Sequence, residues 1–221
     1  MSDRVRASYD TVAGTYAAEI AGELPAKPVD RALYALFAEL VRAEDVPPKV
    51  ADVGCGPGQV GAHLATLDLD VIGIDLSPGM VEVARTRYPD LEFRVGDMIA
   101  PGGLGAPDAG WAGAVCSYSI VHFGASERVL AFTELARVIR PGGWLLLGFH
   151  TSTADHATGE RSHIDDWWGH EVDLDFEFID PAAAAAELAG AGFFVQARLD
   201  REPFAGAELP SRRSYLLAQR R

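Results

Sequence analysis

The sequence predicts an α/β fold in which helices cover both faces of a mostly parallel sheet. Short, β-branched apolar runs alternate with helical patterns from residue 49 onward, which is the order that builds parallel sheets. The first run leads into a glycine-rich turn, and each of the next two ends at or beside an aspartate. The 221 residues, 48% of them hydrophobic, supply enough core for one domain, which we expect to span residues 1–221.

Two helices are expected before the sheet begins. Residues 9–23 and 29–43 have helical patterns and are separated by Pro25 and Pro28. The second helix is expected to pack on the sheet through apolar residues at helical spacing, namely Leu33, Leu36, Phe37, Leu40 and Val41. We therefore treat residues 1–45 as an N-terminal helical cap.

The first strand is expected at residues 49–53, and the turn at residues 54–58 follows it directly. Glycine at every second position of this turn allows positive φ and brings main-chain N–H groups close to a ligand. The helix expected at residues 59–66 points its partly positive N-terminus into the same space. The turn therefore predicts a site for a small, oxygen-rich cofactor.

The second strand, expected at residues 71–75, ends in an acid twenty-one residues beyond Gly54. Nucleotide-binding sheets place a carboxylate at about this distance to accept hydrogen bonds from ribose hydroxyls. Ser77 and Pro78 then open a helix as its N-cap and first residue. Many strand-end aspartates only cap a turn, but the spacing favours the ribose role for Asp75.

The rest of the chain continues the alternation. A helix at residues 126–139 is stopped by the Arg-Pro-Gly-Gly segment at 140–143, because proline cannot continue a helix and glycine accepts the turn. An alanine-rich helix follows Asp180 and Pro181. The remaining strands are expected at residues 91–95, 111–120, 144–149, 194–201 and 214–219.

A dinucleotide-binding turn is the alternative for the glycine-rich segment. Residues 56–61 contain a literal G-x-G-x-x-G, but that fingerprint should begin where the strand ends. Counted from Gly54, the third glycine falls on Gln59, and counted from Gly56, the motif starts two residues late. This phasing disfavours an NAD-dependent oxidoreductase.

The D-x-G-x-G-x-G phasing from Asp52 to Gly58 resembles motif I of the class I S-adenosylmethionine-dependent methyltransferases. The resemblance covers nearly the whole chain except residues 151–180. It implies a Rossmann-like, doubly wound, seven-stranded, mostly parallel sheet whose last strand is antiparallel and lies beside the fifth. It also implies S-adenosyl-L-methionine as cofactor and S-adenosyl-L-homocysteine as product.

The same resemblance assigns the cofactor-binding residues. The glycine turn would cradle the methionine moiety, Asp75 the ribose, and Asp97 with the backbone of the next residue the adenine. An N-terminal helix with two tyrosines resembles the family's helix that closes over the cofactor, although tyrosines at this spacing also suit core packing. The expected set is Tyr9, Tyr16, Asp52, Gly54, Cys55, Gly56, Asp75, Leu76, Met80, Asp97, Met98 and Ser117.

Methyl transfer from a sulfonium is an in-line displacement, so the protein orients the reactants, excludes water and supplies a base where one is needed. His122 lies just past the fourth strand, whose end faces the transferring methyl in the family. We expect it to be the catalytic base and to contact the acceptor. A structural histidine bonded to a loop carbonyl is the alternative. His150, after the fifth strand, is a second expected acceptor-binding residue, and no metal is expected.

Residues 151–180 are expected to form a variable lid or acceptor-binding insertion with a short strand at 175–179. The segment leaves the sheet at the carboxyl edge, where ligands bind in open α/β folds. Trp167 and Trp168 are costly to leave in water, so we expect them to approach the acceptor side of the cofactor. The alternative is a solvated loop whose tryptophans cover an edge of the core.

The formal net charge of −13, from 19 basic and 32 acidic residues, argues against a nucleic-acid partner. Neither a long apolar run nor a signal-peptide core is visible, and the isolated Cys55 and Cys116 indicate reduced thiols. We therefore expect a cytoplasmic monomer or homodimer, without membrane partners, that methylates oxygen or nitrogen of a small-molecule acceptor in natural-product or general metabolism. The alternative is a cofactor-binding regulator or scaffold of the same fold that has lost catalysis.

Overall fold

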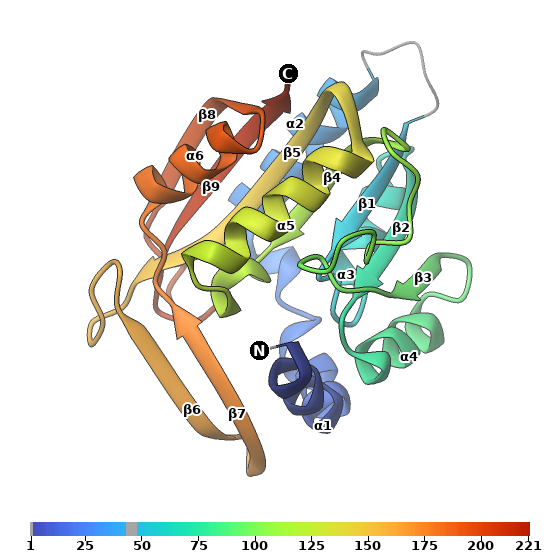
Figure 1. Cartoon of the computed structure of the whole chain (residues 1–221). Coiled ribbons are helices and arrows are strands. Elements are labelled where there is room, and N and C mark those ends of the chain that lie inside the picture. Colours follow the sequence, from blue (N-terminus) through green and yellow to red (C-terminus); the bar gives the residue numbers. More distant parts are fainter. Residues whose placement is uncertain (1, 43–47) are drawn as a thin grey trace.

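A seven-stranded sheet organises the computed structural model, which describes residues 2–42 and 48–221 (Figure 1). The strand order is β3-β2-β1-β4-β5-β9-β8. The pairs among the first five of these strands are parallel, and β9 is antiparallel to both β5 and β8. The predicted Rossmann-like fold, with an antiparallel last strand inserted beside the fifth, is confirmed. The strands are β1 (Lys49–Val53), β2 (Asp70–Asp75), β3 (Glu92–Val95), β4 (Trp111–Ser117), β5 (Ile139–Ser152), β8 (Phe193–Arg201) and β9 (Arg212–Arg220).

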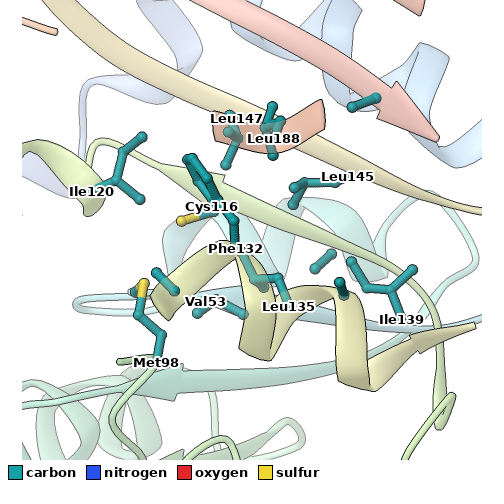
Figure 2. Close-up of a cluster of buried hydrophobic side chains, with 14 of the residues drawn as sticks. Val53, Met98, Cys116, Ile120, Phe132, Leu135, Ile139, Leu145, Leu147 and Leu188 are labelled. Carbon is teal, nitrogen blue, oxygen red and sulfur yellow. The ribbon is translucent and has the colours of Figure 1, made fainter. Parts of the chain in front are cut away.

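Helices cover both faces of this sheet, and strand β5 shows why the sequence requires it. Leu145 and Leu147 face one cluster of buried side chains, while Trp144 and Leu146 between them face the other. Figure 2 shows the first cluster, which α5 and α6 cover; α2 and α3 cover the second. The helices are α1 (Ser2–Ile20), α2 (Pro28–Arg42), α3 (Gln59–Ala65), α4 (Pro78–Arg87), α5 (Ala125–Val138) and α6 (Pro181–Gly190), with 3₁₀ turns η1 (Leu24–Ala26) and η2 (Ile120–His122).

The N-terminal helices differ from the prediction in their bounds. Helix α1 starts seven residues earlier than expected, because Val5 and Val12 are buried against apolar residues of the insertion. Helix α2 packs on the sheet as expected, but Leu36 is 41% exposed and does not take part. The last expected residue of this helix, Ala43, and the end of the predicted cap at 45 lie outside the described residues.

Two boundaries near the middle of the chain also change. Strand β4 stops at Ser117 and not at residue 120, because Tyr118 adopts a φ of 60° and the chain turns into η2. Strand β5 begins at Ile139, which pairs with Trp111, so it starts five residues earlier than predicted. The pairing between β4 and β5 is irregular between these residues and the pair Gly113–Trp144, which accommodates the Arg-Pro-Gly-Gly segment.

The insertion forms a β-hairpin, which the sequence analysis did not predict. Strands β6 (Arg161–Trp167) and β7 (His170–Glu177) pair through a two-residue turn in which Trp168 and Gly169 both have positive φ. The short strand expected at 175–179 corresponds to the end of β7, which starts five residues earlier and ends two residues earlier than predicted. Val172 and Leu174 of β7 pack against Val5 and Val12 of α1, and Figure 1 shows the hairpin beside that helix.

Candidate functional site

A cavity opens where β1, β2, β3 and β4 end, and helix α1 borders it. It encloses about 1170 Å³ of space, open solvent included. Every residue that the sequence analysis assigned to the cofactor lines this cavity, and His122 lines it as well.

The glycine turn packs against its neighbours so closely that Gly54 has no room for a side chain. Gly54 has a φ of 75°, and a Cβ there would lie 2.3 Å from the Ser119 Cβ. Gly56 has a φ of 51°, and its N–H donates to Asp75 Oδ2 at 2.8 Å. A Cβ at Gly56 would meet only the Tyr16 ring, at 3.9 Å, so the space beside this residue is open. The turn is thus a cradle whose backbone borders the cavity.

Asp52 lies beneath this cradle and is almost completely buried. Its Oδ2 accepts a hydrogen bond of 2.8 Å from the Gly61 N–H, which ties the turn to α3. Burial raises the pKa of the Asp52 carboxyl to about 7, in spite of that hydrogen bond. The carboxyl is therefore protonated in the folded protein over a pH range in which the unfolded chain has lost the proton.

We expect Asp52→Asn to change how stability depends on pH. The folded state holds a proton on Asp52 between about pH 4 and pH 7 and the unfolded state does not, so rising pH lowers the free energy of unfolding across that window. Asparagine cannot ionise, so the variant should gain stability relative to the wild type as pH rises, with the difference constant above about pH 7. Denaturant unfolding at several pH values measures this. The control is Asp70→Asn, which changes an exposed residue at the start of β2. If the free energy of unfolding depends on pH equally in wild type and Asp52→Asn, the raised pKa of Asp52 is contradicted.

Asp75 is held at the end of β2 by two main-chain donors. Its Oδ2 accepts from Gly56 and its Oδ1 from the Ser77 N–H at 2.9 Å. Burial raises the pKa of its carboxyl, while these hydrogen bonds oppose the change. Ser77 caps α4 as predicted, since its Oγ accepts from the Met80 N–H at 3.0 Å. Asp10 of α1 accepts from Ser77 Oγ and from the Gly79 N–H, so α1 is fastened directly beside the cavity.

His122 lies in η2, buried between α1 and β7. Its Nδ1 is 2.9 Å from the Asp175 carbonyl oxygen, and its Nε2 is 2.7 Å from the Tyr9 hydroxyl. A carbonyl only accepts, so Nδ1 carries the proton, Nε2 has the lone pair, and Tyr9 donates to it. Burial lowers the pKa of His122 to about 4. The structural alternative expected a bond to a loop carbonyl; the carbonyl that His122 meets belongs to strand β7, and this bond also prepares Nε2 to accept a proton.

The lining of the cavity also includes members of a polar cluster that the sequence did not predict. Tyr118 donates from its hydroxyl to Asp30 Oδ1 at 3.0 Å, and the two hydroxyls of Tyr118 and Tyr215 are 2.7 Å apart. Lys27 Nζ lies 5.6 Å from the centre of the Tyr118 ring. Lys27, Asp30 and Tyr118 line the cavity, and the positive φ of Tyr118 directs the chain at this point. In the sequence, the one signal for this cluster is that Tyr118 lies close to His122, just past the fourth strand.

Three expected acceptor-binding residues do not line the cavity. His150 is stacked on Tyr118 with ring centres 4.8 Å apart, its Nδ1 is 2.6 Å from Ser211 Oγ, and burial with nearby cations lowers its pKa to about 3. Trp167 contacts the rings of Tyr9 and Tyr16, at 6.0 and 5.6 Å between centres, and Trp168 stacks on Trp167. The expected direct approach of the tryptophans is corrected: they form a layer behind the two tyrosines.

Within residues 2–42 and 48–221, no group of three or more histidine, cysteine, aspartate and glutamate side chains is arranged to hold a metal ion. The helices of the described ranges are too short or too polar to span a bilayer. Cys55 and Cys116 are both buried free thiols.

This chain resembles known proteins both in sequence and in fold. A methyltransferase-domain family model matches residues 50–143. The demethylmenaquinone methyltransferase of Renibacterium salmoninarum is 32% identical over 146 residues, which are 66% of this chain and 58% of that protein. The chain thus spans less than two thirds of the length of this relative.

Two solved structures resemble the whole chain. The magnesium protoporphyrin IX methyltransferase of Synechocystis PCC 6803, solved with bound S-adenosylmethionine, has a TM-score of 0.67 at 18% identity and covers 100% of this chain and 97% of its own. The [4+2]-cyclase SpnF has a TM-score of 0.70 at 19% identity, with the same coverage. These identities support the fold alone, whereas the family model and the sequence relative match the segment that contains the glycine turn. Residues 50–143 are thus similar in sequence to a methyltransferase domain, and the whole chain has a fold that it shares with an S-adenosylmethionine-bound methyltransferase.

Proposed function

We propose that this protein binds S-adenosyl-L-methionine in the cavity and transfers its methyl group to oxygen or nitrogen of a small-molecule acceptor, leaving S-adenosyl-L-homocysteine. The observation that carries the proposal is the cavity lining. The glycine cradle, the strand-end acids Asp75 and Asp97, and the α1 tyrosines Tyr9 and Tyr16 all border one space. The resemblance to methyltransferases in sequence supports the same conclusion.

The lining fits this cofactor in shape and in charge. Each carboxylate offers about four lone-pair sites, and the backbone uses two of those on Asp75, so the others suit ribose hydroxyls. Leu76, Met80 and Met98 give apolar surface near the strand ends. Among the acidic residues of the lining, Glu23 and Asp30 are paired with Lys27 and Arg201, and burial keeps Asp52 protonated up to about pH 7, whereas Asp75 and Asp97 add negative charge. Such a lining attracts a cation.

The protein's own groups would then orient and shield the reactants. The bound cofactor supplies an electrophilic methyl on a sulfonium. Helix α1 places Tyr9 and Tyr16 against the cavity and is braced from behind by the hairpin, which excludes water from the reaction. His122, with its Nδ1 proton held by the Asp175 carbonyl, supplies the basic nitrogen.

Removing the Asp75 carboxylate should weaken cofactor binding. Hydrogen bonds to a charged acceptor contribute about 1.5–3 kcal/mol each, so Asp75→Ala should lower the affinity for S-adenosylmethionine roughly ten-fold or more. Calorimetry with S-adenosylmethionine and S-adenosylhomocysteine measures the effect, and both ligands should bind the wild type with similar affinity. Asp70→Ala, at the exposed end of the same strand, should bind normally. Unchanged binding by Asp75→Ala would remove this residue from the ribose site, and binding of NAD would favour the oxidoreductase alternative.

A second candidate function keeps the cofactor site without methyl transfer. A protein named as a cyclase has the same fold over its full length, and one fold can carry several activities. In this alternative the protein is a catalytically silent, cofactor-binding regulator or scaffold. Mass spectrometry of small molecules that co-purify, followed by turnover assays on the identified acceptor, separates the two: labelled methyl on any acceptor excludes the silent alternative.

The charge of the chain supports the remaining proposals about its surroundings. With a net charge of −13, the protein would be repelled by nucleic-acid phosphates, so we propose no nucleic-acid partner. Two buried, unpaired thiols suit a reducing compartment, and we propose a cytoplasmic location on that ground.

A further inference from the structure

Both ring nitrogens of His122 are already engaged, and this limits how the histidine can meet an acceptor. Nδ1 donates to the Asp175 carbonyl, and Nε2 accepts the Tyr9 hydroxyl proton at 2.7 Å. An acceptor therefore cannot reach Nε2 while Tyr9 stays in place. The Tyr9 oxygen keeps an unused lone pair, because a phenol both donates and accepts, and Tyr9 itself lines the cavity.

We infer that Tyr9 is the catalytic residue that takes the proton from the methyl acceptor, with His122 behind it, and that the acceptor is a hydroxyl compound that still carries its proton at neutral pH. This inference rests on the proposed function. In this Tyr9–His122 relay, the acceptor O–H proton passes to Tyr9 Oη while the Tyr9 proton passes to His122 Nε2. The acceptor oxygen bonds the methyl carbon as the carbon–sulfur bond breaks, and its electron pair stays on sulfur. His122 later releases the proton to solvent.

The charges around His122 suit such a transfer. The titratable groups that contact His122 are Tyr9 of α1, which has Tyr16 beside it, and Asp175 of β7, whose carboxylate is paired with Arg4 and His163. Burial opposes a charge on His122 and raises the pKa of Tyr9, so both are neutral before reaction. When the sulfonium loses its charge, the imidazolium gains one. The net charge of the cavity is therefore unchanged, which avoids creating an additional buried charge.

The lining also disfavours a carboxylate as acceptor. Lys27 is the cation that lines the described cavity, and its Nζ is already 2.5 Å from Glu23 Oε2. A carboxylate would enter a lining that includes Glu23, Asp75 and Asp97, where like charges repel it. It would also arrive without a proton, so the Tyr9–His122 pair would have nothing to accept. A phenol or enol meets neither obstacle.

The kinetic test compares wild type with Tyr9→Phe on substituted phenols of graded acidity and on a matched set of carboxylic acids. Positioned acid–base groups contribute about 10²–10⁴-fold, so the variant should lose turnover by that factor on the least acidic phenol. The loss should shrink toward nitrophenols, whose oxygen is already ionised, with the KM for S-adenosylmethionine little changed. Tyr88→Phe, which removes a phenol outside the cavity lining, is the control. An equal loss on every phenol would show a structural role and overturn the relay.

A second measurement needs no turnover. In ¹⁵N-histidine spectra of the complex with S-adenosylhomocysteine, His122 should be the Nδ1–H tautomer, with Nε2 as hydrogen-bond acceptor. Tyr9→Phe should move the Nε2 resonance toward that of an imidazole nitrogen that accepts no hydrogen bond. It should also raise the pKa of His122, because the neutral ring loses the hydrogen bond that Tyr9 donates to it. An Nε2–H tautomer, or spectra that Tyr9→Phe leaves unchanged, would overturn the relay.

The outcomes separate this inference from the proposed function. If calorimetry finds no binding of S-adenosylmethionine, the proposed function itself fails. If the cofactor binds and only carboxylic acids are methylated, the proposed function stands and the relay is overturned. If the cofactor binds and neither set is methylated, the hydroxyl assignment is overturned. Methylation of phenols with the graded loss in Tyr9→Phe supports both.

Discussion

His122→Ala should lower turnover by about 10²–10⁴-fold while cofactor binding stays nearly intact, because the variant removes the nitrogen that receives the proton. The glycine turn and Asp75, which we propose hold the cofactor, are joined by their own hydrogen bonds and not through this side chain. Stopped assays on the identified acceptor give kcat, and calorimetry gives the affinity for S-adenosylmethionine. His156→Ala is the matched control, since His156 stacks on Phe178 and does not line the cavity.

The pH profile gives an independent check on this residue. Burial holds the pKa of His122 at about 4, so its neutral, basic form persists on acidification well below the ordinary histidine range. Wild-type turnover should therefore not fall near pH 6.5 because of this group. Protonation of His122 should lower turnover only as the pH approaches 4. Near-normal turnover in His122→Ala would show an acceptor that needs no base, and equal losses of stability and activity would indicate a structural role.

Arg201→Met should destabilise the protein by about 3–5 kcal/mol, because it leaves the buried Asp30 carboxylate without its cation. The Arg201 side chain is 8% exposed, and its guanidinium lies 2.7 Å from Asp30 Oδ2 and 2.5 Å from Glu208 Oε1. Arg213 remains 3.2 Å from Glu208, whereas Asp30 keeps only hydroxyl donors. For a domain of this size, the loss corresponds to a decrease in Tm of roughly 6–20 °C.

The control for this prediction lies on the same strand. Arg198 pairs with Asp200, and both side chains are 45% exposed, so Arg198→Met should cost about 1 kcal/mol or less. Burial alone would raise the pKa of Glu208, but hydrogen bonds from Arg201 and from the Phe204 N–H outweigh it and hold that pKa below its usual value. Ionised Glu208 therefore adds stability that is lost as pH falls. The difference in the free energy of unfolding between wild type and Arg201→Met should become smaller below about pH 4.5. A small difference in the free energy of unfolding between wild type and Arg201→Met at neutral pH would show that this buried ion pair does not stabilise the fold.

The sequence by itself determined the features that depend on neighbouring residues. The β-branched runs and the glycines at alternate positions located β1, β2 and the turn between β1 and α3, because such patterns act within a few residues. Ser77 and Pro78 likewise opened α4 as predicted. Since parallel strands end at one edge of a sheet, these local predictions already placed Asp75 and Asp97 beside the glycine turn.

Only the tertiary structure decided the partners of those groups. Tyr9 and Asp175 meet His122 across 113 and 53 residues, and Asp30 meets Arg201 across 171. No local pattern encodes such contacts, because they arise when α1, the hairpin and β8 pack around the strand ends. Packing also set apart the histidines that the sequence analysis had grouped as acceptor contacts. His122 lines the cavity, whereas Tyr118, with its positive φ, lies between His150 and that space.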